Sequence, residues 1–139
     1  MLSEHLNSFL CQLNVLARQI ASTYNLSLSQ YFTLSSISTT GISMTDLSRS
    51  IGVDNSTLTR NINVLIAKSL VSKERSSMDG RGFIVHLTSD GDSIIDLMVS
   101  KMETIVETIS KDLDPQEREN IIEIISKLNW KITCHLNEL

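Results

Sequence analysis

The 139-residue sequence has little proline and glycine, with one proline and five glycines, and it contains no low-complexity tract. This composition excludes a long disordered linker. No apolar run approaches the roughly 20 residues that cross a membrane, and the first residues lack the charged-then-apolar layout of a signal peptide. With 41% hydrophobic residues, the chain is expected to be one cytoplasmic domain with its own core and no membrane partner.

Catalytic and metal-binding motifs are also missing. The three histidines, at positions 5, 86 and 135, are far apart, and there is no phosphate loop, H-E-x-x-H, paired CxxC or G-x-S-x-G. Cys134 and His135 are adjacent, but neighbouring residues on a helix diverge by about 100° and rarely bind one ion together. We therefore expect no enzymatic activity, no metal and no cofactor.

The middle of the chain predicts two short helices around a glycine turn. Ser43 followed three residues later by Asp46 gives an N-cap hydroxyl and an acidic third residue at a helix start. Gly52 ends this helix, and Asp54 offers an N-cap carboxylate to a second helix over about 55–68. The short connection around Gly52 matches a helix-turn-helix in length and composition.

The second of these helices separates its residues by chemistry. Its apolar positions at helical spacing are Leu58, Ile62, Leu65 and Ile66, and its polar positions are Asn55, Ser56, Thr57, Thr59, Arg60 and Asn63. Short hydrogen-bonding side chains with one guanidinium suit base edges and phosphates in a major groove, whereas a solvated face is usually richer in Glu and Lys. A plain amphipathic helix with a Ser/Asn/Thr surface is the alternative interpretation.

A two-stranded ribbon is predicted after this helix. Residues 71–75 and 83–87 are rich in strand-forming or charged side chains, and the turn between them contains two glycines. Arg75 ends the first strand as a candidate DNA-binding residue. Arg81 at the tip can enter a minor groove, with Asp79 holding it in position. The alternative is a surface ion pair between these two residues that contributes little.

Four stretches carry a family resemblance: residues 54–60, Leu70-Val71, the Asp79-x-Arg81 pair and residues 85–91, which include the pattern L-T-x-x-G. In order and spacing they resemble the MarR family of bacterial transcription regulators. The chain departs from the family in having serine at position 69, where glycine is common, and Gly80-Arg81 in place of two consecutive arginines.

The resemblance implies a fold class that is mainly α with a small β-wing. A single domain would fill residues 1–139, with a winged helix-turn-helix over 27–88 and dimerisation helices over 1–26 and 89–139. Residues 43–87 carry six cations and four acids, net +2, whereas residues 88–139 carry five cations and eleven acids, net −6. Because +2 is weak for DNA binding, two copies on one site would help considerably.

The flanking segments predict helices with much aliphatic surface. Apolar spacing predicts a helix over about 2–22, a Ser27–Gln30 pair predicts one through about Thr39 that buries Phe32, Leu34 and Ile37, and two long helices follow residues 88 and 114. The apolar band of the first long helix predicts two buried faces. This surface exceeds what a small winged helix covers, so we expect a symmetric homodimer, with a monomer as the alternative.

The expected function is therefore that of a DNA-binding transcription regulator. It would act as a repressor and homodimer on double-stranded DNA, at a pseudo-palindromic operator with half-sites roughly 10 base pairs apart. The resemblance implies release by a small-molecule effector bound between the DNA-reading part and the dimerisation helices. One alternative is a winged-helix module for protein interaction, without DNA.

The two cysteines leave a second alternative open. A cytosolic chain keeps Cys11 and Cys134 reduced, and their helical positions suggest buried structural thiols. Cys11 together with Tyr31 resembles the organic-hydroperoxide sensors of the same family, in which a first-helix cysteine is held by two tyrosines. Here at most one tyrosine is kept, since position 28 is leucine, and no Lys or Arg lies within a helical turn of Cys11.

Overall fold

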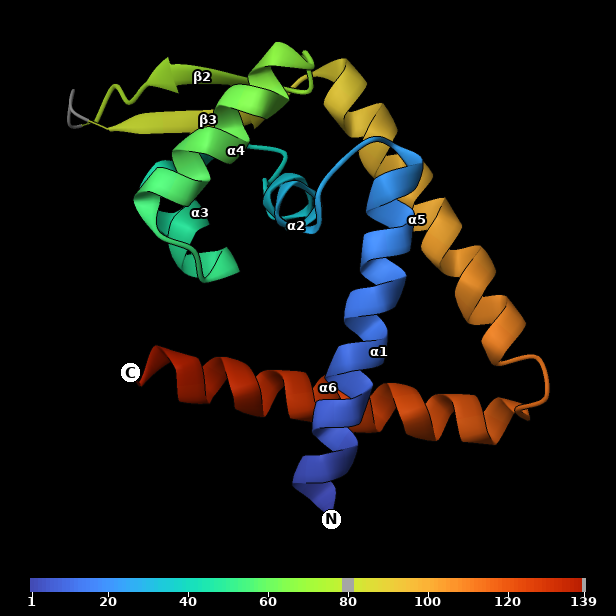
Figure 1. Cartoon of the computed structure of the whole chain (residues 1–139). Coiled ribbons are helices and arrows are strands. Elements are labelled where there is room, and N and C mark those ends of the chain that lie inside the picture. Colours follow the sequence, from blue (N-terminus) through green and yellow to red (C-terminus); the bar gives the residue numbers. More distant parts are fainter. Residues whose placement is uncertain (79–81, 139) are drawn as a thin grey trace. The chain divides into compact units, whose positions relative to one another are not determined.

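The computed structural model describes residues 1–78 and 82–138. Its elements are α1 (Leu2–Thr23), α2 (Leu28–Ser35), β1 (Ile42–Ser43), α3 (Met44–Ile51), α4 (Asn55–Ala67), β2 (Val71–Arg75), β3 (Phe83–Leu87), α5 (Ser89–Ile109) and α6 (Pro115–Asn137) (Figure 1). The chain divides into two compact units, Met1–Met102 and Glu103–Leu139. None of the helices in these described ranges combines the length and apolar content needed to cross a membrane.

Side-chain caps fix the helix starts, as the sequence predicts. At α2, Ser27 and Gln30 bond reciprocally, with side chain to backbone distances of 3.1 and 3.0 Å. At α3, the Ser43 hydroxyl accepts a hydrogen bond of 3.1 Å from the backbone N–H of Asp46. Each cap satisfies an N–H that has no partner within its helix, so these boundaries are set by short-range sequence.

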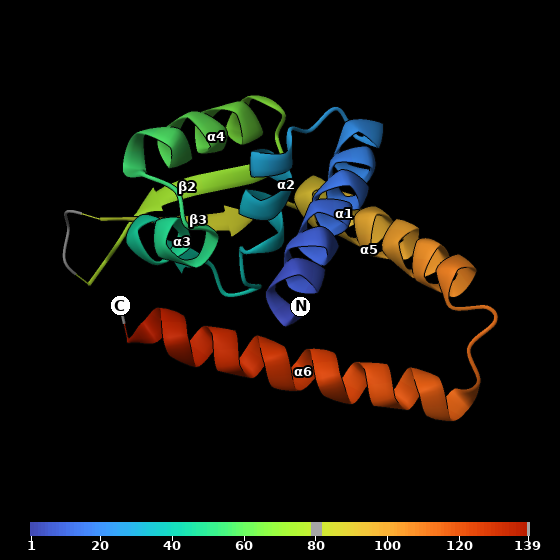
Figure 2. The same cartoon turned by 60° about the horizontal axis from the view of Figure 1, so that its bottom comes forward.

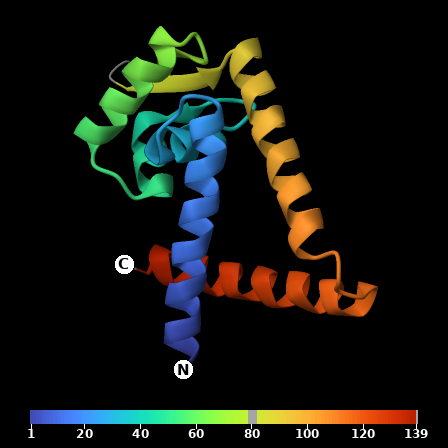
Figure 3. The same ribbon diagram turned by 45° about the vertical axis from the view of Figure 1, so that its right-hand side comes forward.

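The core of the first unit forms around α2, which contacts α1, α3 and α4. Figures 1 and 3 show α2 lying between α1 and the α3–α4 pair. Six of the fully buried apolar side chains are Leu34, Leu47, Leu58, Ile62, Leu65 and Val85. They come from α2, α3, α4 and β3, so the two short helices and the strand share one core, and the fold is mainly α with a small sheet, as expected.

The sheet contains a strand that sequence analysis missed. Its order is β1-β3-β2, with both pairings antiparallel, and Ile42 of β1 lies opposite Val85. Val71 faces Leu87 and Arg75 faces Phe83 in the predicted ribbon. Figure 2 shows β2 and β3 side by side, and α4 packs against β2. In Figures 1 and 3 the paired strands extend away from the beginning of α5.

The connection from α4 to β2 closes without glycine. Ser69 adopts a left-handed conformation with φ of +61°. Its N–H bonds to the Ile66 carbonyl at 2.8 Å, and the N–H of Leu70 bonds to the Leu65 carbonyl at 2.9 Å, which satisfies two carbonyls at the helix end. Serine thus occupies the backbone conformation in which glycine is usual.

The L-T-x-x-G pattern has a structural explanation at this same point. The Thr88 hydroxyl donates to the Ser69 carbonyl at 2.6 Å and accepts from the Gly91 N–H at 3.0 Å. The N–H of Thr88 also bonds to the Leu70 carbonyl at 3.1 Å. Thr88 therefore caps α5 and ties its start to the end of α4.

The prediction for α2 was wrong in two respects. The helix ends at Ser35 rather than near Thr39, because the chain turns over 38–41 to enter β1. In that turn the Gly41 N–H bonds to the Ser38 carbonyl at 2.9 Å, and Gly41 has φ of +87°. Leu34 and Ile37 are buried as predicted, but Phe32 is 42% exposed.

The aliphatic residues near the two termini are largely uncovered within one chain. In α5 only Gly91 and Met98 are buried, so the prediction of two buried faces does not hold for a single chain, and α6 buries no described residue. The exposed large apolar residues of α1 and α6 are Leu2, Leu6, Phe9, Leu10, Leu13, Val15, Ile121, Ile122, Ile124, Ile125, Trp130, Ile132 and Leu136. Within the second unit, Arg118 closes the turn before α6 by donating to the carbonyls of Ser110 and Leu113 at 2.7 and 3.2 Å.

Candidate nucleic-acid interface

The start of α4 is held by a network around the Asp54 carboxylate. Gly52 turns the chain with φ of +67°, and Asp54 then accepts hydrogen bonds from the Ser56 hydroxyl at 2.5 Å and from the N–H and hydroxyl of Thr57, both at 2.8 Å. These donors, the Ser56 hydroxyl first, hold the pKa of Asp54 well below its usual range. Two of the predicted DNA-binding hydroxyls are therefore engaged by the cap.

The remaining predicted residues of α4 lie on one exposed face. Asn55, Thr59, Arg60 and Asn63 are exposed, and Thr57 is half-buried. Arg60 Nη2 donates to Thr57 Oγ1 at 3.4 Å, and the Thr59 hydroxyl donates to the Asn55 carbonyl at 2.8 Å. The structure thus brings the predicted residues of this helix together as one polar surface with a single guanidinium.

The buried face of α4 differs from the prediction at two positions. Ile66 is 38% exposed, whereas Asn61 is only 9% exposed and lies among the buried residues. The Asn61 amide donates to the Ser29 hydroxyl at 2.7 Å and to the Thr33 hydroxyl at 3.3 Å. These hydrogen bonds offset the free-energy cost of removing the amide from water, and they link α4 to α2. Helical periodicity does not reveal such a residue, because its partners come from another helix.

The wing presents two cations beside an aromatic ring. Lys73 Nζ lies 4.6 Å from the centroid of the Phe83 ring, and the Arg75 guanidinium carbon lies 5.9 Å from it. Alternation along β2 and the pairing of Arg75 with Phe83 place all three side chains on one face of the sheet. We call Lys73, Arg75 and Phe83 the wing face. The sequence prediction included Arg75 and missed the other two.

The opposite face of the wing carries an acid and a histidine. Glu74 Oε1 and His86 Nε2 are 2.8 Å apart, linking β2 to β3. The His86 ring also lies against Gly41, where an added β-carbon would come within 2.5 Å of the ring. The acid of β2 is therefore directed away from the cations of the wing face. The predicted residues Asp79 and Arg81 lie outside the described residues.

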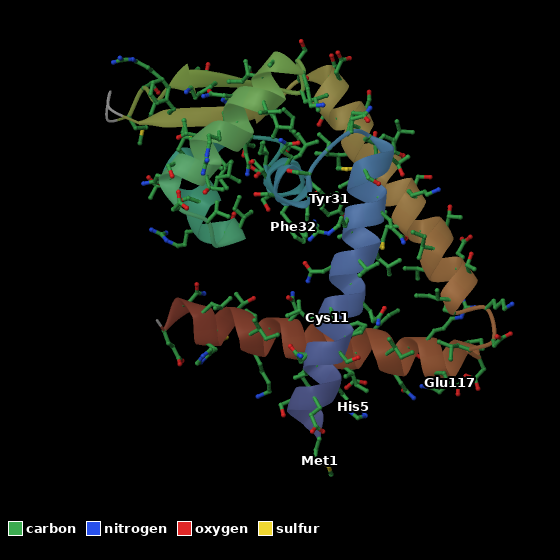
Figure 4. All side chains as sticks on the ribbon, in the orientation of Figure 1. Met1, His5, Cys11, Tyr31, Phe32 and Glu117 are labelled. Carbon is green, nitrogen blue, oxygen red and sulfur yellow. The ribbon has the colours of Figure 1, made fainter. Side chains whose placement is uncertain are left out.

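Cys11 and Tyr31 are not brought together. Figure 4 shows Cys11 partway along α1 and Tyr31 on α2, and no hydrogen bond joins them within residues 1–78 and 82–138. The Tyr31 ring contacts Phe32 edge to face, with centroids 5.4 Å apart. Cys11 is exposed and Cys134 half-exposed, so the interpretation of buried thiols is wrong for a single chain. The apolar neighbours Phe9, Leu10 and Leu13 are exposed as well, so this stretch of α1 is uncovered on all sides within one chain.

Comparison with known proteins gives a family match over most of the first unit. The model of a family described as transcriptional regulator SarA/Rot matches residues 15–98. An uncharacterized helix-turn-helix transcriptional regulator, YdgJ of Bacillus subtilis, is 26% identical over 91 residues, which are 66% of this chain but only 56% of that protein. The transcriptional regulator TcaR of Staphylococcus aureus is 23% identical over 140 residues, covering 96% of this chain and 93% of TcaR.

Solved structures agree in fold. A MarR protein from Peptoclostridium difficile has a TM-score of 0.81 at 18% identity, covering 99% of this chain and 90% of that one. A mutant of S. aureus MepR bound to an oligodeoxyribonucleotide has a TM-score of 0.66 at 17% identity, covering 95% of this chain and 98% of that one. The predicted MarR resemblance is confirmed at the level of fold, and these relatives are regulators rather than enzymes.

Proposed function

Because the chain belongs to the SarA/Rot family of transcriptional regulators, we propose that it binds specific double-stranded DNA as a homodimer and represses transcription until a small ligand releases it. The observation that carries this proposal is the exposed polar face of α4, a helix that starts at the Asp54 cap and contacts the wing strand β2. A MepR structure of the same fold contains bound DNA, which adds support.

We assign the two surfaces different roles. The α4 face lies at a helix N-terminus and offers amide, hydroxyl and guanidinium groups, which suit base edges and phosphates in the major groove. Its residues are Asn55, Ser56, Thr57, Thr59, Arg60 and Asn63. Lys73 and Arg75 would bind phosphates, and Asp79 with Arg81 would act at the wing tip, as the family resemblance implies.

The homodimer is supported by the uncovered apolar residues. Ile122 and Trp130 of α6 are 66% and 69% exposed, and Leu2 of α1 is 68% exposed. A monomer rarely leaves so many large apolar side chains in water. A symmetric pair would bury them and hold two α4 helices at fixed spacing, so half-sites should lie roughly 10 base pairs apart.

Salt-dependent binding to random duplex DNA tests this function. Neutralisation of several phosphates predicts affinity that falls steeply with salt, and Arg60→Ala should weaken binding. Arg18→Ala is the matched control, because Arg18 is an exposed arginine on α1 outside the proposed interface. Binding without salt dependence, or equal loss in both variants, would contradict the proposal and favour a protein-interaction module. Selection from random duplexes would then give the half-site spacing.

A test of oligomeric state addresses the dimer separately. Sedimentation at micromolar concentration should give twice the mass of the chain. A single species of 15.5 kDa would contradict the dimer and leave DNA binding to be explained by one copy.

A thiol sensor is the second candidate, and the exposure of Cys11 is the observation in its favour. Peroxide should then weaken DNA binding of the unmodified sequence and of Cys134→Ser, but not of Cys11→Ser. If Cys11→Ser still loses affinity on treatment, the sensor hypothesis fails.

A further inference from the structure

The hydroxyl groups at the start of α4 already donate hydrogen bonds inside the chain. The hydroxyls of Ser56 and Thr57 donate to the Asp54 carboxylate at 2.5 and 2.8 Å. One turn further, the Thr59 hydroxyl donates to the Asn55 carbonyl at 2.8 Å. A base edge could take one of these protons only if the existing bond broke. These three hydroxyls are therefore poorly placed to distinguish one base pair from another.

Two side chains further along the helix keep their donors available. Asn63 is exposed, and within residues 1–78 and 82–138 its side-chain amide has no hydrogen-bond partner. Arg60 donates to Thr57 Oγ1 at 3.4 Å, which uses one of the five N–H donors of a guanidinium. Each of these two side chains can therefore bind two atoms of one base at the same time.

Val64 adds an apolar group beside these two residues. Its exposed fraction is 38%. Residues three and four positions apart share one face of a helix, so Asn63 and Val64 both lie next to Arg60. Ile66 is also 38% exposed, but at six positions from Arg60 it lies about 120° away around the helix. We call Arg60, Asn63 and Val64 the reading cluster. The sequence prediction did not include Val64.

The spacing within the reading cluster matches that of base pairs. Three residues of helix rise about 4.5 Å, and successive base pairs are about 3.4 Å apart. Arg60 and Asn63 can thus reach neighbouring base pairs. In the major groove, arginine binds O6 and N7 of guanine, asparagine binds N6 and N7 of adenine, and an apolar side chain contacts the methyl group of thymine. The three side chains therefore differ in the base that each one fits.

We propose that the reading cluster specifies three bases in each half-site: Arg60 binds a guanine, Asn63 binds an adenine in the neighbouring base pair, and Val64 contacts the methyl group of a thymine beside that adenine. This inference rests on the proposed DNA-binding function. It adds the identity of the bases and assigns a specificity-determining role to Val64.

Selection from random duplexes, with the unmodified protein and three variants, tests the assignment. Asn63→Ala should lose the preference for adenine at one position of each half-site, a loss of about tenfold in discrimination, and should keep the preference for guanine. Val64→Ala should lose the preference for thymine at another position. Ile66→Ala is the matched control, since it removes an equally exposed apolar side chain outside the reading cluster, and it should keep every preference.

Base analogues test the same contacts without changing the protein. Uracil in place of thymine removes only the methyl group, and 7-deazaadenine in place of adenine removes the N7 acceptor. At the assigned positions, uracil should lower the affinity of the unmodified protein about threefold, and 7-deazaadenine should lower it several-fold. The uracil effect should vanish in Val64→Ala and the 7-deazaadenine effect in Asn63→Ala, because side chain and base atom form one contact.

The outcomes separate this assignment from the proposed function. A selection that enriched no sequence with the unmodified protein would overturn both. An enriched sequence whose adenine preference survived in Asn63→Ala, or a uracil effect that persisted in Val64→Ala, would overturn the assignment alone. If a variant failed to fold, the analogues would still decide with the unmodified protein, since affinity unchanged by uracil at every thymine would exclude a methyl contact.

Discussion

Gly91 lies so close to Leu70 that a β-carbon at position 91 would come within 2.0 Å of the Leu70 carbonyl oxygen. The close approach lets Thr88 bond to both Ser69 and Gly91, joining the end of α4 to the start of α5. Glycine is required here for space rather than for an unusual backbone angle.

Gly91→Ala should therefore destabilise the protein by about 3 kcal/mol, because a backbone carbonyl cannot move aside as a flexible side chain can. Denaturant unfolding measures the change. Gly52→Ala is a useful comparison, since no atom lies within 4 Å of its β-carbon position and its penalty comes only from φ of +67°. A smaller loss at position 91 than at position 52 would contradict the steric explanation.

Ser69→Gly should stabilise the protein by about 1 kcal/mol, because glycine adopts a left-handed conformation without the penalty of a side chain. The thermal unfolding midpoint should rise. Asn25→Gly provides the control, with φ of +54° at a residue type that tolerates this conformation. Its gain should be smaller, and an equal gain at both positions would count against the argument.

Asp54→Asn should alter the pH dependence of stability. The Ser56 and Thr57 donors hold the pKa of Asp54 below its usual range, so its charge stabilises the fold above that range and the contribution is lost as pH falls through the lowered pKa. Below about pH 4, stability should thus fall less steeply with acid in Asp54→Asn. Asparagine remains a good N-cap, so helix content at neutral pH should be unchanged. Identical acid profiles would contradict the prediction.

Phe83→Leu should weaken DNA binding about threefold, because an exposed cation–π contact contributes about 0.5–1 kcal/mol. The slope of affinity against salt should stay the same, since both cations of the wing face remain. Lys73→Ala should instead reduce that slope by about one ion. Phe83→Tyr keeps the ring and should restore normal affinity, so a loss in this variant would show that the ring does not act on the cations.

Substitutions at Asn61 and Asn63, which lie on opposite faces of α4, should affect different properties: the first the stability of the fold and the second the affinity for DNA. Asn61→Ala should cost about 2 kcal/mol, because it removes buried hydrogen bonds to Ser29 and Thr33. Asn63→Ala, on the exposed face, should leave the free energy of unfolding unchanged and lower DNA affinity. Denaturant titration and binding assays on both variants check this, and the reverse pattern would invalidate the assignment of faces.

The sequence predicted the features that depend on neighbouring residues. The caps at Ser27, Ser43 and Asp54 act within three residues, so the starts of α2, α3 and α4 were found from the sequence. The two-residue strand β1 was not found, because Ile42 and Ser43 are strand only through pairing with β3. The end of α2 was missed for the same reason, since the turn at 38–41 serves that pairing.

The residues of the candidate site also fall into those that local sequence predicts and those that only the folded structure reveals. The exposed residues of α4 follow from helical periodicity, and Arg75 from its place at the end of a strand. Lys73 and Phe83 required the cross-strand register, and Asn61 required the position of α2. Periodicity also overestimated burial in α5 and at Phe32, since an apolar residue signals a surface that needs covering but not which chain covers it.

The cap of α4 has a consequence for the thermodynamics of the proposed DNA recognition. Ser56 and Thr57 already donate to the Asp54 carboxylate, so a phosphate oxygen that takes either hydroxyl replaces an oxygen anion supplied by the chain itself. When such a hydroxyl contacts DNA, its hydrogen bond passes from the Asp54 carboxylate to a phosphate oxygen. The enthalpy of the contact is therefore only the difference between these two similar hydrogen bonds. Discrimination between DNA sites at this helix end should then come from geometry. A hydrogen bond from Ser56 or Thr57 favours binding only where the DNA backbone places a phosphate oxygen better than Asp54 places its carboxylate.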